Sequence, residues 1–332
     1  MLTACFFCRT NDPGILERVD FYAQDLRILK DLGFDVRVAT RPSELVPANL
    51  YFVWWWTWAF LPIMYARLRR KPVIVTGTFD YWKFAERPAW HRALQRYALR
   101  AADANVFVSE LERSSVSEAL ATRNAQYVPH GVDTSIFVPP PADAVREPFI
   151  LTIAGSGMDH QNSTRKCIAE IIRAAPLIRR QHPETRFVIV GKKGTDFPML
   201  CELAHDVGAG SYIDFPGIID DSEKLRLLQT CRAYLQPSRY EGFGLSILEA
   251  MSCGAPVITT AVGAVPEVGG DAVRYSLDSS PESIAEATSA VLSDLGAQRA
   301  LARAARQRAV SCFPIERRRH ELEKVVLEVL AT

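Results

Sequence analysis

Two glutamates, Glu241 and Glu249, stand eight residues apart in the stretch EGFGLSILEAMSCGAPVI. A glycine-bracketed turn, Gly242–Gly244, separates the first glutamate from Leu245–Cys253, which has the pattern of a short helix. Free amides and the dipole at a helix start bind phosphate, and glycines let a ligand approach the backbone. Carboxylates repel phosphate but are good bidentate acceptors for paired hydroxyl groups. The spacing therefore suits a ligand with a central diphosphate and hydroxyl-rich groups on both sides, which is the form of a nucleotide-sugar. The plainer alternative is two solvated glutamates around a simple turn.

The rest of the chain alternates apolar, strand-like runs with helix-length segments. Runs such as LTACFF and KPVIVTG in the first half, and FILTIAG and RFVIVGK in the second, are separated by amphipathic stretches. Parallel sheets need such crossovers, so the alternation predicts two doubly wound α/β domains. Four prolines between residues 139 and 148 predict a linker. We expect an N-terminal domain over residues 1–140, a linker over 141–147, a C-terminal domain over 148–311, and a final amphipathic helix over 312–332 that can pack back on the N-terminal domain.

Composition narrows the class of protein. The 332 residues suit two domains, and a net charge of +1 gives no signal for nucleic acid. Seven scattered cysteines do not form a disulfide framework, so we expect a reducing cytoplasm. Cys5 and Cys8 form a CxxC inside an apolar run, which favours a buried strand over a metal or redox site. The uncharged stretch Leu50–Ala66 predicts a strand near residues 50–55 and a helix from about 58 to 69, rather than a membrane span.

The motif around the two glutamates closely resembles the E-x7-E signature of the retaining glycosyltransferases of family 4. VPHGVD, residues 128–133, resembles the family's segment ahead of the interdomain linker, and VGAVPE, residues 262–267, resembles its "GG.PE" loop. The likeness covers most of residues 100–275 and is weaker over residues 1–100. It implies the GT-B fold, in which two Rossmann-like domains face each other across a cleft.

The resemblance also implies roles for residues that bind the donor. Glu249 would bind the ribose hydroxyls, Glu241 would bind the transferred sugar, and the backbone of Gly242, Phe243, Gly244 and Leu245 would hold the diphosphate. The nucleotide base would be read by backbone groups near Gly191 and Ile218.

The cations that neutralise the leaving diphosphate match the family only in part. Lys166 corresponds to the family's lysine, which opens a helix. No arginine stands near Ser156, where the family has one, so either Arg165 takes that role or one cation is missing. GSGMDH, residues 155–160, also resembles a dinucleotide fingerprint, but its third glycine is absent.

The acceptor side departs further from the family. The first loop, RTNDPGIL, offers Asn11 and only one glycine, Gly14. The fourth strand ends VTGTFDYW, without the family's histidine, which leaves Asp80 as the polar candidate for an acceptor hydroxyl or the donor sugar. A plain helix-capping role for Asp80 is the alternative. His130 stands beside the linker, and we read it as structural.

Residues 67–100 form a basic segment with nine Lys or Arg against Asp80 and Glu86, and Trp82 and Trp90 interleave with them. A solvated helix face explains such a segment. The more specific interpretation is a surface patch that binds anionic lipid or a phosphorylated acceptor.

Together these features predict a metal-independent glycosyltransferase of hexosyl type that needs no cofactor. The donor would be a nucleotide-diphosphate sugar, with UDP or GDP as the nucleotide. The acceptor would be a hydroxyl of a saccharide, a lipid-linked molecule or a small molecule, in polysaccharide, glycolipid or glycoconjugate biosynthesis. We expect no nucleic-acid partner, and a location in the cytoplasm or at the inner face of the membrane. Because the cation and acceptor segments differ from the family pattern, two alternatives stay open. One is a nucleotide-sugar epimerase of the same fold, and the other is a non-catalytic relative that binds a nucleotide-sugar.

Overall fold

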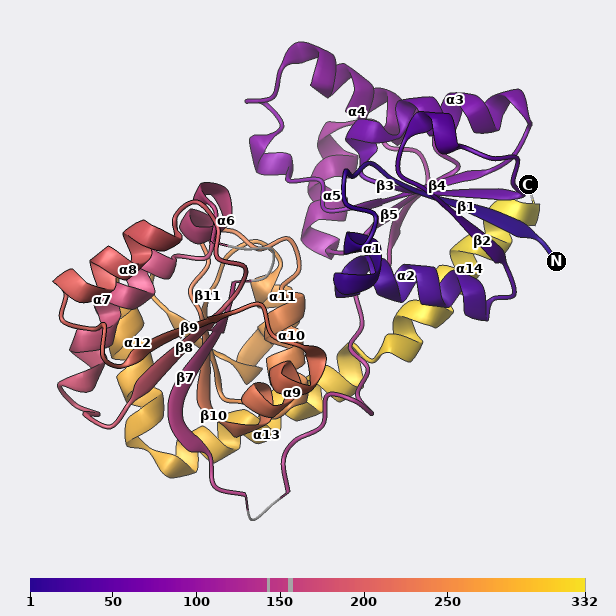
Figure 1. The fold of residues 1–332 in the computed structure, drawn as a ribbon. Helices are drawn as coiled ribbons and strands as arrows, with labels where there is room; N and C mark the ends of the chain where they lie inside the picture. The colour runs from indigo at the N-terminus through magenta and orange to yellow at the C-terminus, as the bar shows by residue number, and fades with distance from the viewer. Residues whose placement is uncertain (142–143, 155–157, 332) are drawn as a thin grey trace. The chain divides into compact units, whose positions relative to one another are not determined.

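The computed structural model describes residues 1–141, 144–154 and 158–331. The chain folds into two compact units (Figure 1). The first unit contains Met1–Gly131 together with the chain from Ile315 on, and the second contains Val132–Pro314. The first unit is therefore built from two separate stretches of sequence, whereas the second is continuous.

The first unit is built on a parallel six-stranded sheet in the order β2-β1-β3-β4-β5-β6. Its strands are β1 (Thr3–Cys8), β2 (Asp35–Ala39), β3 (Leu50–Trp54), β4 (Val73–Gly77), β5 (Ala104–Phe107) and β6 (Ala125–Tyr127). Its helices are α1 (Ile15–Arg18), α2 (Asp20–Asp31), α3 (Phe60–Leu68), α4 (Ala89–Ala101), α5 (Glu110–Ala119) and α14 (Ile315–Ala331), with 3-10 turns η1 (Pro42–Glu44), η2 (Trp56–Trp58) and η3 (Tyr81–Lys83). Strands such as β3 and β4 are mostly apolar and wholly buried because helices cover both faces of the sheet.

The two faces of this sheet have separate cores. One core joins residues of α1 and α2 to residues of α14, and the other joins residues of α3, α4 and α5. Cys5 belongs to the second core and Cys8 to the first, because they lie three residues apart on one strand. The strand predicted for the CxxC segment is confirmed, and so are the strand and helix predicted within residues 50–69. Within the described ranges, no helix combines the length and apolar character that crossing a bilayer requires.

The last helix, α14, completes the first unit. Its residues Leu322, Val325, Val326 and Val329 are buried in the core that also contains residues of α2. On the same helix, Arg318 is fully buried and forms a bidentate ion pair with Asp25 of α2, with Nε–Oδ1 and Nη2–Oδ2 distances of 2.8 and 2.9 Å. Its Nη1 donates to the carbonyl oxygens of Val128 and Pro129. One guanidinium thus joins α14, α2 and the end of the segment that leaves the first unit.

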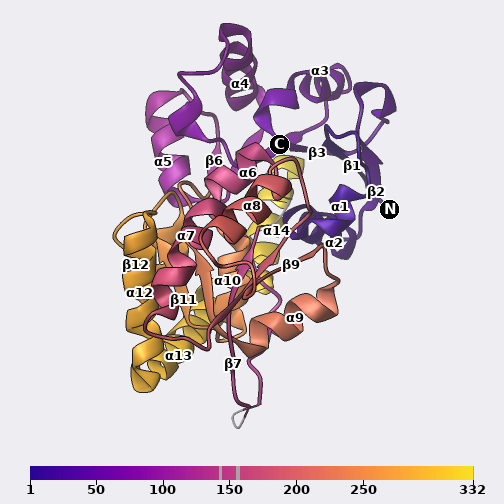
Figure 2. The same ribbon diagram turned by 60° about the vertical axis from the view of Figure 1, so that its left-hand side comes forward.

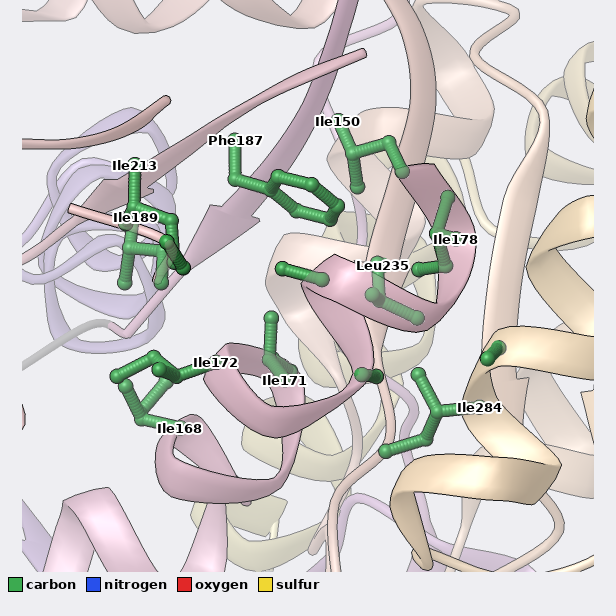
Figure 3. Packing of buried hydrophobic residues seen from close by; sticks show 14 of the residues in the cluster. Ile150, Ile168, Ile171, Ile172, Ile178, Phe187, Ile189, Ile213, Leu235 and Ile284 are labelled. Carbon is green, nitrogen blue, oxygen red and sulfur yellow. The ribbon is translucent and has the colours of Figure 1, made fainter. Parts of the chain in front are cut away.

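The second unit has a parallel six-stranded sheet in the order β12-β11-β10-β7-β8-β9, of which Figure 2 labels the two edge strands, β12 and β9. Its strands are β7 (Glu147–Ile153), β8 (Arg186–Val190), β9 (Ile213–Gly217), β10 (Cys231–Gln236), β11 (Val257–Thr260) and β12 (Arg274–Ser276). Its helices are α6 (His160–Arg165), α7 (Ile168–Arg179), α8 (Phe197–Asp206), α9 (Asp221–Thr230), α10 (Leu245–Ser252), α11 (Val265–Gly269), α12 (Pro281–Ser293) and α13 (Leu295–Cys312), with the 3-10 turn η4 (Gly270–Ala272). Figure 3 shows the core between the sheet and α7 and α12; Phe187 of β8, Ile171 of α7 and Ile284 of α12 belong to this one buried cluster.

The strand order of the second unit reverses between β7 and β10. The chain runs outward from β7 to β8 and β9 on one side, and from β10 to β11 and β12 on the other. In α/β proteins, ligands bind at the carboxyl edge of the sheet where the strand order reverses, because the loops after the two central strands run in opposite directions there. The described segments at this point are Ala154 and residues 158–166 after β7, and residues 237–244 after β10.

The unit boundaries differ from those expected from the prolines. The chain passes from the first unit to the second at Gly131, not at residue 140, and returns at Ile315 rather than at residue 312. Residues 132–140 pack on the second unit: the carbonyl oxygen of Phe137 accepts hydrogen bonds from Ser252 Oγ at 2.6 Å and Arg306 Nη1 at 2.7 Å. Prolines disfavour regular structure but do not prevent packing, so the proline-rich segment was a poor marker of the boundary. Residues 142 and 143 of the expected linker lie outside the described residues.

Candidate active site

Glu241 lies in the loop after β10 and is the centre of a buried polar cluster in the second unit. Its Oε2 accepts three hydrogen bonds, from Lys166 Nζ at 2.8 Å, Gln236 Nε2 at 2.9 Å and Ser238 Oγ at 3.3 Å. Arg165 Nη1 lies 3.3 Å from both carboxylate oxygens. The structure therefore brings three of the predicted catalytic residues, Glu241, Lys166 and Arg165, into direct contact.

The charges in this cluster depend on one another. Burial works against the charge of Glu241, but the charges of Lys166 and Arg165 and the hydrogen bonds from Lys166 and Ser238 hold the pKa of Glu241 below its usual value. Burial also lowers the pKa of Lys166; Glu241 opposes this shift, and Arg165 adds to it. With both cations protonated and the carboxylate ionised, the three side chains carry two positive charges and one negative charge. The cluster is thus held together by its own ion pairs and still keeps an excess of one positive charge.

Lys166 and Arg165 lie at the junction of two helices. Asp159 caps α6 by accepting a hydrogen bond from the amide of Asn162, and Lys166 ends this helix. Cys167 then adopts a left-handed conformation with a φ of 55°, and α7 begins after it. The expectation that Lys166 opens a helix, as the family's lysine does, is therefore wrong: Lys166 ends α6, and the turn at Cys167 separates it from α7. Ser156 and the glycines of the GSGMDH segment lie outside the described residues.

The glycine turn brings the chain from Glu241 into α10. Gly244 has a φ of +93°, and a Cβ there would lie 3.3 Å from Cγ of Glu241, so a side chain would crowd the carboxylate. Gly244 is also the N-cap of α10 and, as a glycine, has no side chain to cap that end. Leu245 starts the helix and Phe243 is buried, with its ring 5.8 Å from that of Phe313. The positive end of the α10 dipole thus lies next to the cluster around Glu241.

A second loop packs directly over the backbone of Glu241. Gly263 has a φ of +53°, and a Cβ on it would lie 2.2 Å from the carbonyl oxygen of Glu241. The amide of Ala264 donates to the same oxygen at 3.0 Å. These residues belong to the VGAVPE stretch, so the structure explains why a glycine is required in that loop.

Glu249 lies inside α10 and is buried. It is separate from the cluster around Glu241. Lys224 of α9 donates from Nζ to Oε1 of Glu249 at 3.2 Å, and its ammonium group also lies 5.2 Å from the ring centre of Phe137. Sequence reasoning missed Lys224 because nothing in the pattern of α9 distinguishes it from a surface lysine. The two glutamates of the motif therefore contact different lysines: Glu241 contacts Lys166, and Glu249 contacts Lys224.

Gln236 is a second residue that sequence reasoning missed. It ends β10, is fully buried, and donates from Nε2 to Glu241. Its Oε1 accepts hydrogen bonds from the hydroxyl groups of Tyr234 at 2.6 Å and Ser246 at 2.8 Å. The amide therefore connects the carboxylate to the first turn of α10. The available signal was a polar side chain at the end of the apolar run CRAYL, directly before the motif.

The residues expected near the nucleotide base lie at the ends of two neighbouring strands. Gly191 follows β8, its amide donates to the carbonyl oxygen of Gly217 at 3.0 Å, and a Cβ on it would lie 2.9 Å from Cβ of Ala154. Ile218 follows β9 and is 76% exposed. Both stand at the same edge of the sheet as the loops after β7 and β10, because all strands of the sheet are parallel.

The remaining candidates belong to the first unit. Asp80 has a left-handed φ of 52°, and its amide and that of Phe79 donate to the carboxylate of Glu112 at 2.7 and 2.8 Å. Asp80 stands before η3, but its side chain makes no capping hydrogen bond there, so the expected alternative of a cap is wrong. Its Oδ2 lies 3.9 Å from Arg87 Nη2.

The other two candidates of the first unit, Asn11 and Gly14, are in the loop after β1. Asn11 is exposed, and Gly14 is the N-cap of α1.

His130 is buried and stacks on Trp54 with ring centres 6.1 Å apart. Burial, together with the charge of Arg318, holds the pKa of His130 well below its usual value. A neutral, stacked ring supports the structural interpretation of His130.

The second unit of this chain resembles a known protein family in sequence. Residues 146–308, which include Lys166, Glu241 and Glu249, match the sequence model of the family described as glycosyl transferases group 1. A glycogen synthase of Mycobacterium tuberculosis is 36% identical over 150 residues, which are 45% of this chain and 36% of the relative. The chain thus spans about a third of the length of that relative.

Solved structures match the whole chain. The sucrose-phosphate synthase of Thermosynechococcus elongatus has a TM-score of 0.81 at 18% identity and covers 100% of both chains. The Anabaena protein HepE, solved in complex with UDP and glucose, has a TM-score of 0.79 at 16% identity over 99% of this chain and 100% of its own. These likenesses confirm the two-domain GT-B fold predicted from the sequence.

Proposed function

We propose that this chain, in which residues 146–308 match the glycosyl transferases of group 1, is a retaining glycosyltransferase that transfers a sugar from a nucleotide-diphosphate sugar to an acceptor hydroxyl. One observation carries the proposal. Lys166 and Arg165 meet Glu241 beside the start of α10, where the N-cap is the glycine Gly244, at the point where the strand order of the second unit reverses. Two cations and a helix N-terminus at such a position suit a leaving diphosphate.

Lys166 and Arg165 would stabilise the negative charge that develops on the leaving diphosphate. An ammonium group has three donors, and Glu241 accepts a hydrogen bond from one of them, so we propose that the others bind phosphate oxygens. A cation about 4 Å from a phosphate contributes up to about 4 kcal/mol at an effective dielectric constant of about 20. Because the protein supplies these charges itself, we propose that the reaction needs no metal ion and proceeds in the presence of a chelator.

Glu241 would have two tasks. Its Oε2, which accepts three hydrogen bonds, fixes Lys166 and so positions the cations. Its Oε1, with Arg165 on one side, would then meet a hydroxyl of the transferred sugar. The bond from the sugar to the diphosphate breaks through an oxocarbenium-like state. The leaving phosphate accepts the proton of the acceptor hydroxyl, which attacks from the same face, so the anomeric configuration is retained.

Glu249 would bind the ribose of the donor. Its carboxylate is on α10, more than one turn beyond Leu245, so a diphosphate at the helix start would place the ribose towards it. Lys224 donates to one of its oxygens at 3.2 Å and so orients the carboxylate. Backbone groups near Gly191 and Ile218 would face the base, with UDP or GDP as the nucleotide. That the similar HepE was solved with UDP and glucose supports a nucleotide-sugar donor.

The acceptor would be bound by the first unit. Its candidate residues follow the carboxyl ends of parallel strands: Asn11 and Gly14 after β1, and Asp80 after β4. We propose Asp80 for an acceptor hydroxyl or the donor sugar, because Glu112 fixes its backbone while 36% of its side chain is exposed. A saccharide, a lipid-linked molecule or a small molecule would fit this role, and the reaction would take place in the cytoplasm.

A panel of UDP-, GDP- and ADP-sugars tests the proposal. One donor should raise the melting temperature of the purified protein and should be hydrolysed slowly, with release of free nucleotide that accelerates when an acceptor is added. Isomerisation of the sugar without nucleotide release would instead identify an epimerase. Binding with no turnover, even with acceptor extracts, would identify a non-catalytic nucleotide-sugar-binding protein. Product anomers resolved by NMR would test retention.

A further inference from the structure

One helix of the first unit exposes an apolar face. Ala59, Ile63 and Ala66 point into the core beneath α3, whereas Phe60, Leu61, Met64 and Leu68 are exposed on its other side. Leu61 and Leu68 are 49% and 80% exposed, and their seven-residue spacing places them on the same side of the helix. Scattered apolar residues are normal on a protein surface, but four on one face of a nine-residue helix form a patch.

The neighbouring helix presents cations on its exposed side. Arg96 and Arg100 lie one turn apart on α4 and are exposed, with Trp90 near the start of the same helix at 59% exposure. Neither residues 60–71 nor residues 89–101 contain an aspartate or glutamate, whereas Arg69 and Arg70 follow α3 directly. The two helices therefore combine apolar and positive surface without negative charge.

Tyr97 joins the two helices into one surface. Its hydroxyl donates to Sδ of Met64 at 3.2 Å, and its ring centre lies 5.1 Å from that of Phe60. Beside it, a hollow of about 420 Å³ is lined by residues of α4 that include Arg96 and Arg100. We call this surface the α3–α4 face; it comprises Phe60, Leu61, Met64, Leu68, Arg69, Arg70, Arg96 and Arg100.

Tryptophans mark the edge of the α3–α4 face where the strands of the first unit end. Trp58 lies in the turn after β3 and is 46% exposed, and Trp90 begins α4, which follows the loop after β4. The strands are parallel, so this edge also carries Asn11 and Asp80. Tryptophan is enriched where a protein meets the boundary between lipid headgroups and acyl chains.

We propose that the α3–α4 face docks the protein on a bilayer that contains anionic lipid. The exposed apolar side chains of α3 enter the headgroup–acyl boundary, and the arginines of α4 and of the segment after α3 bind lipid phosphates. If a second copy of this chain bound through the same face, its arginines would lie opposite these arginines, and the two sets would repel each other. A nucleic acid would pair with the arginines but would leave Leu61 and Leu68 without apolar partners. The proposal goes beyond sugar transfer and does not depend on it, because binding to lipid can be measured without a donor.

Flotation with vesicles tests this proposal on the full chain. Vesicles of phosphatidylcholine alone are compared with vesicles that also contain about 30% phosphatidylglycerol, at salt concentrations from about 20 to about 500 mM. We expect binding to the anionic vesicles only, and binding that weakens as salt increases. Arg96→Glu/Arg100→Glu should reduce the partition coefficient at least about tenfold. Leu61→Ser/Leu68→Ser should reduce it as well, with little change in the salt dependence.

Two matched variants control for general effects of charge and apolar surface. Arg299→Glu/Arg303→Glu reverses two exposed arginines with the same four-residue spacing on α13. Leu277→Ser/Leu327→Ser replaces two leucines that are 94% and 60% exposed elsewhere. Both should bind anionic vesicles like the wild type. Absence of binding at low salt, or equal losses in test and control variants, would overturn the proposal. So would a dimer that Arg96→Glu/Arg100→Glu dissociates while lipid binding is unchanged.

Discussion

Lys166 and Glu241 form a buried ion pair, with Nζ 2.8 Å from Oε2, although 75 residues separate them in sequence. The pair joins the loop after β7 to the loop after β10, and Gln236 and Arg165 complete it. The proposed departure of the diphosphate depends on this contact, because it fixes the cation that would meet the leaving group.

Lys166→Met should abolish most of the donor turnover. Loss of a preorganised donor to a developing negative charge reduces kcat by roughly 10²–10³-fold. We expect release of nucleotide from the preferred donor to fall by at least that factor, while circular dichroism shows a folded protein. Lys30→Met, which removes an exposed lysine of α2, is the control and should keep full turnover. Normal turnover in Lys166→Met would exclude Lys166 from the chemistry.

Glu249→Ala should weaken the binding of free nucleotide. Charged hydrogen bonds contribute about 1.5–3 kcal/mol, so the dissociation constant of the preferred nucleoside diphosphate should rise about 10- to 150-fold. Isothermal titration calorimetry measures this change. Glu286→Ala, at an exposed position of α12, should bind nucleotide like the wild type. If Glu249→Ala keeps its affinity, the ribose assignment is wrong.

Gly263→Ala should disturb Glu241 through the backbone. A Cβ at residue 263 would lie 2.2 Å from the carbonyl oxygen of Glu241, in addition to the strain of a φ of +53°. Gly208→Ala separates the two effects, because Gly208 has a φ of +72° and a Cβ there would meet nothing within 4 Å. The control should lose only the roughly 1–2 kcal/mol of left-handed strain. Gly263→Ala should lose more stability in urea denaturation and should also lose donor turnover. Equal effects of the two changes would show that the contact with Glu241 is easily relieved.

Acid should remove the stability that Glu241 contributes. Its pKa is lower in the folded chain than the ordinary value of 4.5, so the unfolded state takes up the proton first. The contribution is therefore present above the ordinary pKa and is lost as pH falls through the lower folded-state value. Glu241→Gln cannot titrate, so its deficit in free energy of unfolding should be largest near neutral pH and should shrink from about pH 5 to about pH 3. Urea midpoints across this range measure it. A deficit that does not change with pH contradicts an ionised Glu241, and Glu286→Gln serves as the exposed control.

Arg318→Met should destabilise the first unit strongly. The change leaves the carboxylate of Asp25 buried without its bidentate partner, and breaking such a pair costs about 3–5 kcal/mol. Denaturation followed by tryptophan fluorescence should show this loss. Arg319→Met alters the next residue, which is exposed, and should change stability by less than about 0.5 kcal/mol. Equal stability of both variants would mean that the buried pair contributes nothing net.

The sequence predicted the strands well because buried parallel strands are continuous apolar runs, as β3 and β4 show. It also pointed to Glu241, Lys166 and Arg165, through the resemblance of the motifs. It did not reveal Gln236 or Lys224, because their importance comes from which side chain they face across the fold, and local patterns do not contain that information. The left-handed turn at Cys167, which separates Lys166 from α7, was equally hidden, because cysteine gives no signal for that conformation.

The contact between Arg318 and Asp25 has a consequence for the order in which the chain folds during synthesis. Asp25 leaves the ribosome early, but its partner on α14 is made almost three hundred residues later, after the whole of the second unit. The second unit is continuous and can complete its core first, although it is encoded later. Until α14 is made, Asp25 has no Arg318 to pair with, and among the described residues only α1 and α2 supply helical residues to the core on that face of the sheet. A growing chain that stops before Ile315 would therefore carry a finished second unit and an unfinished first one, and that half would be the natural target of chaperones and proteases.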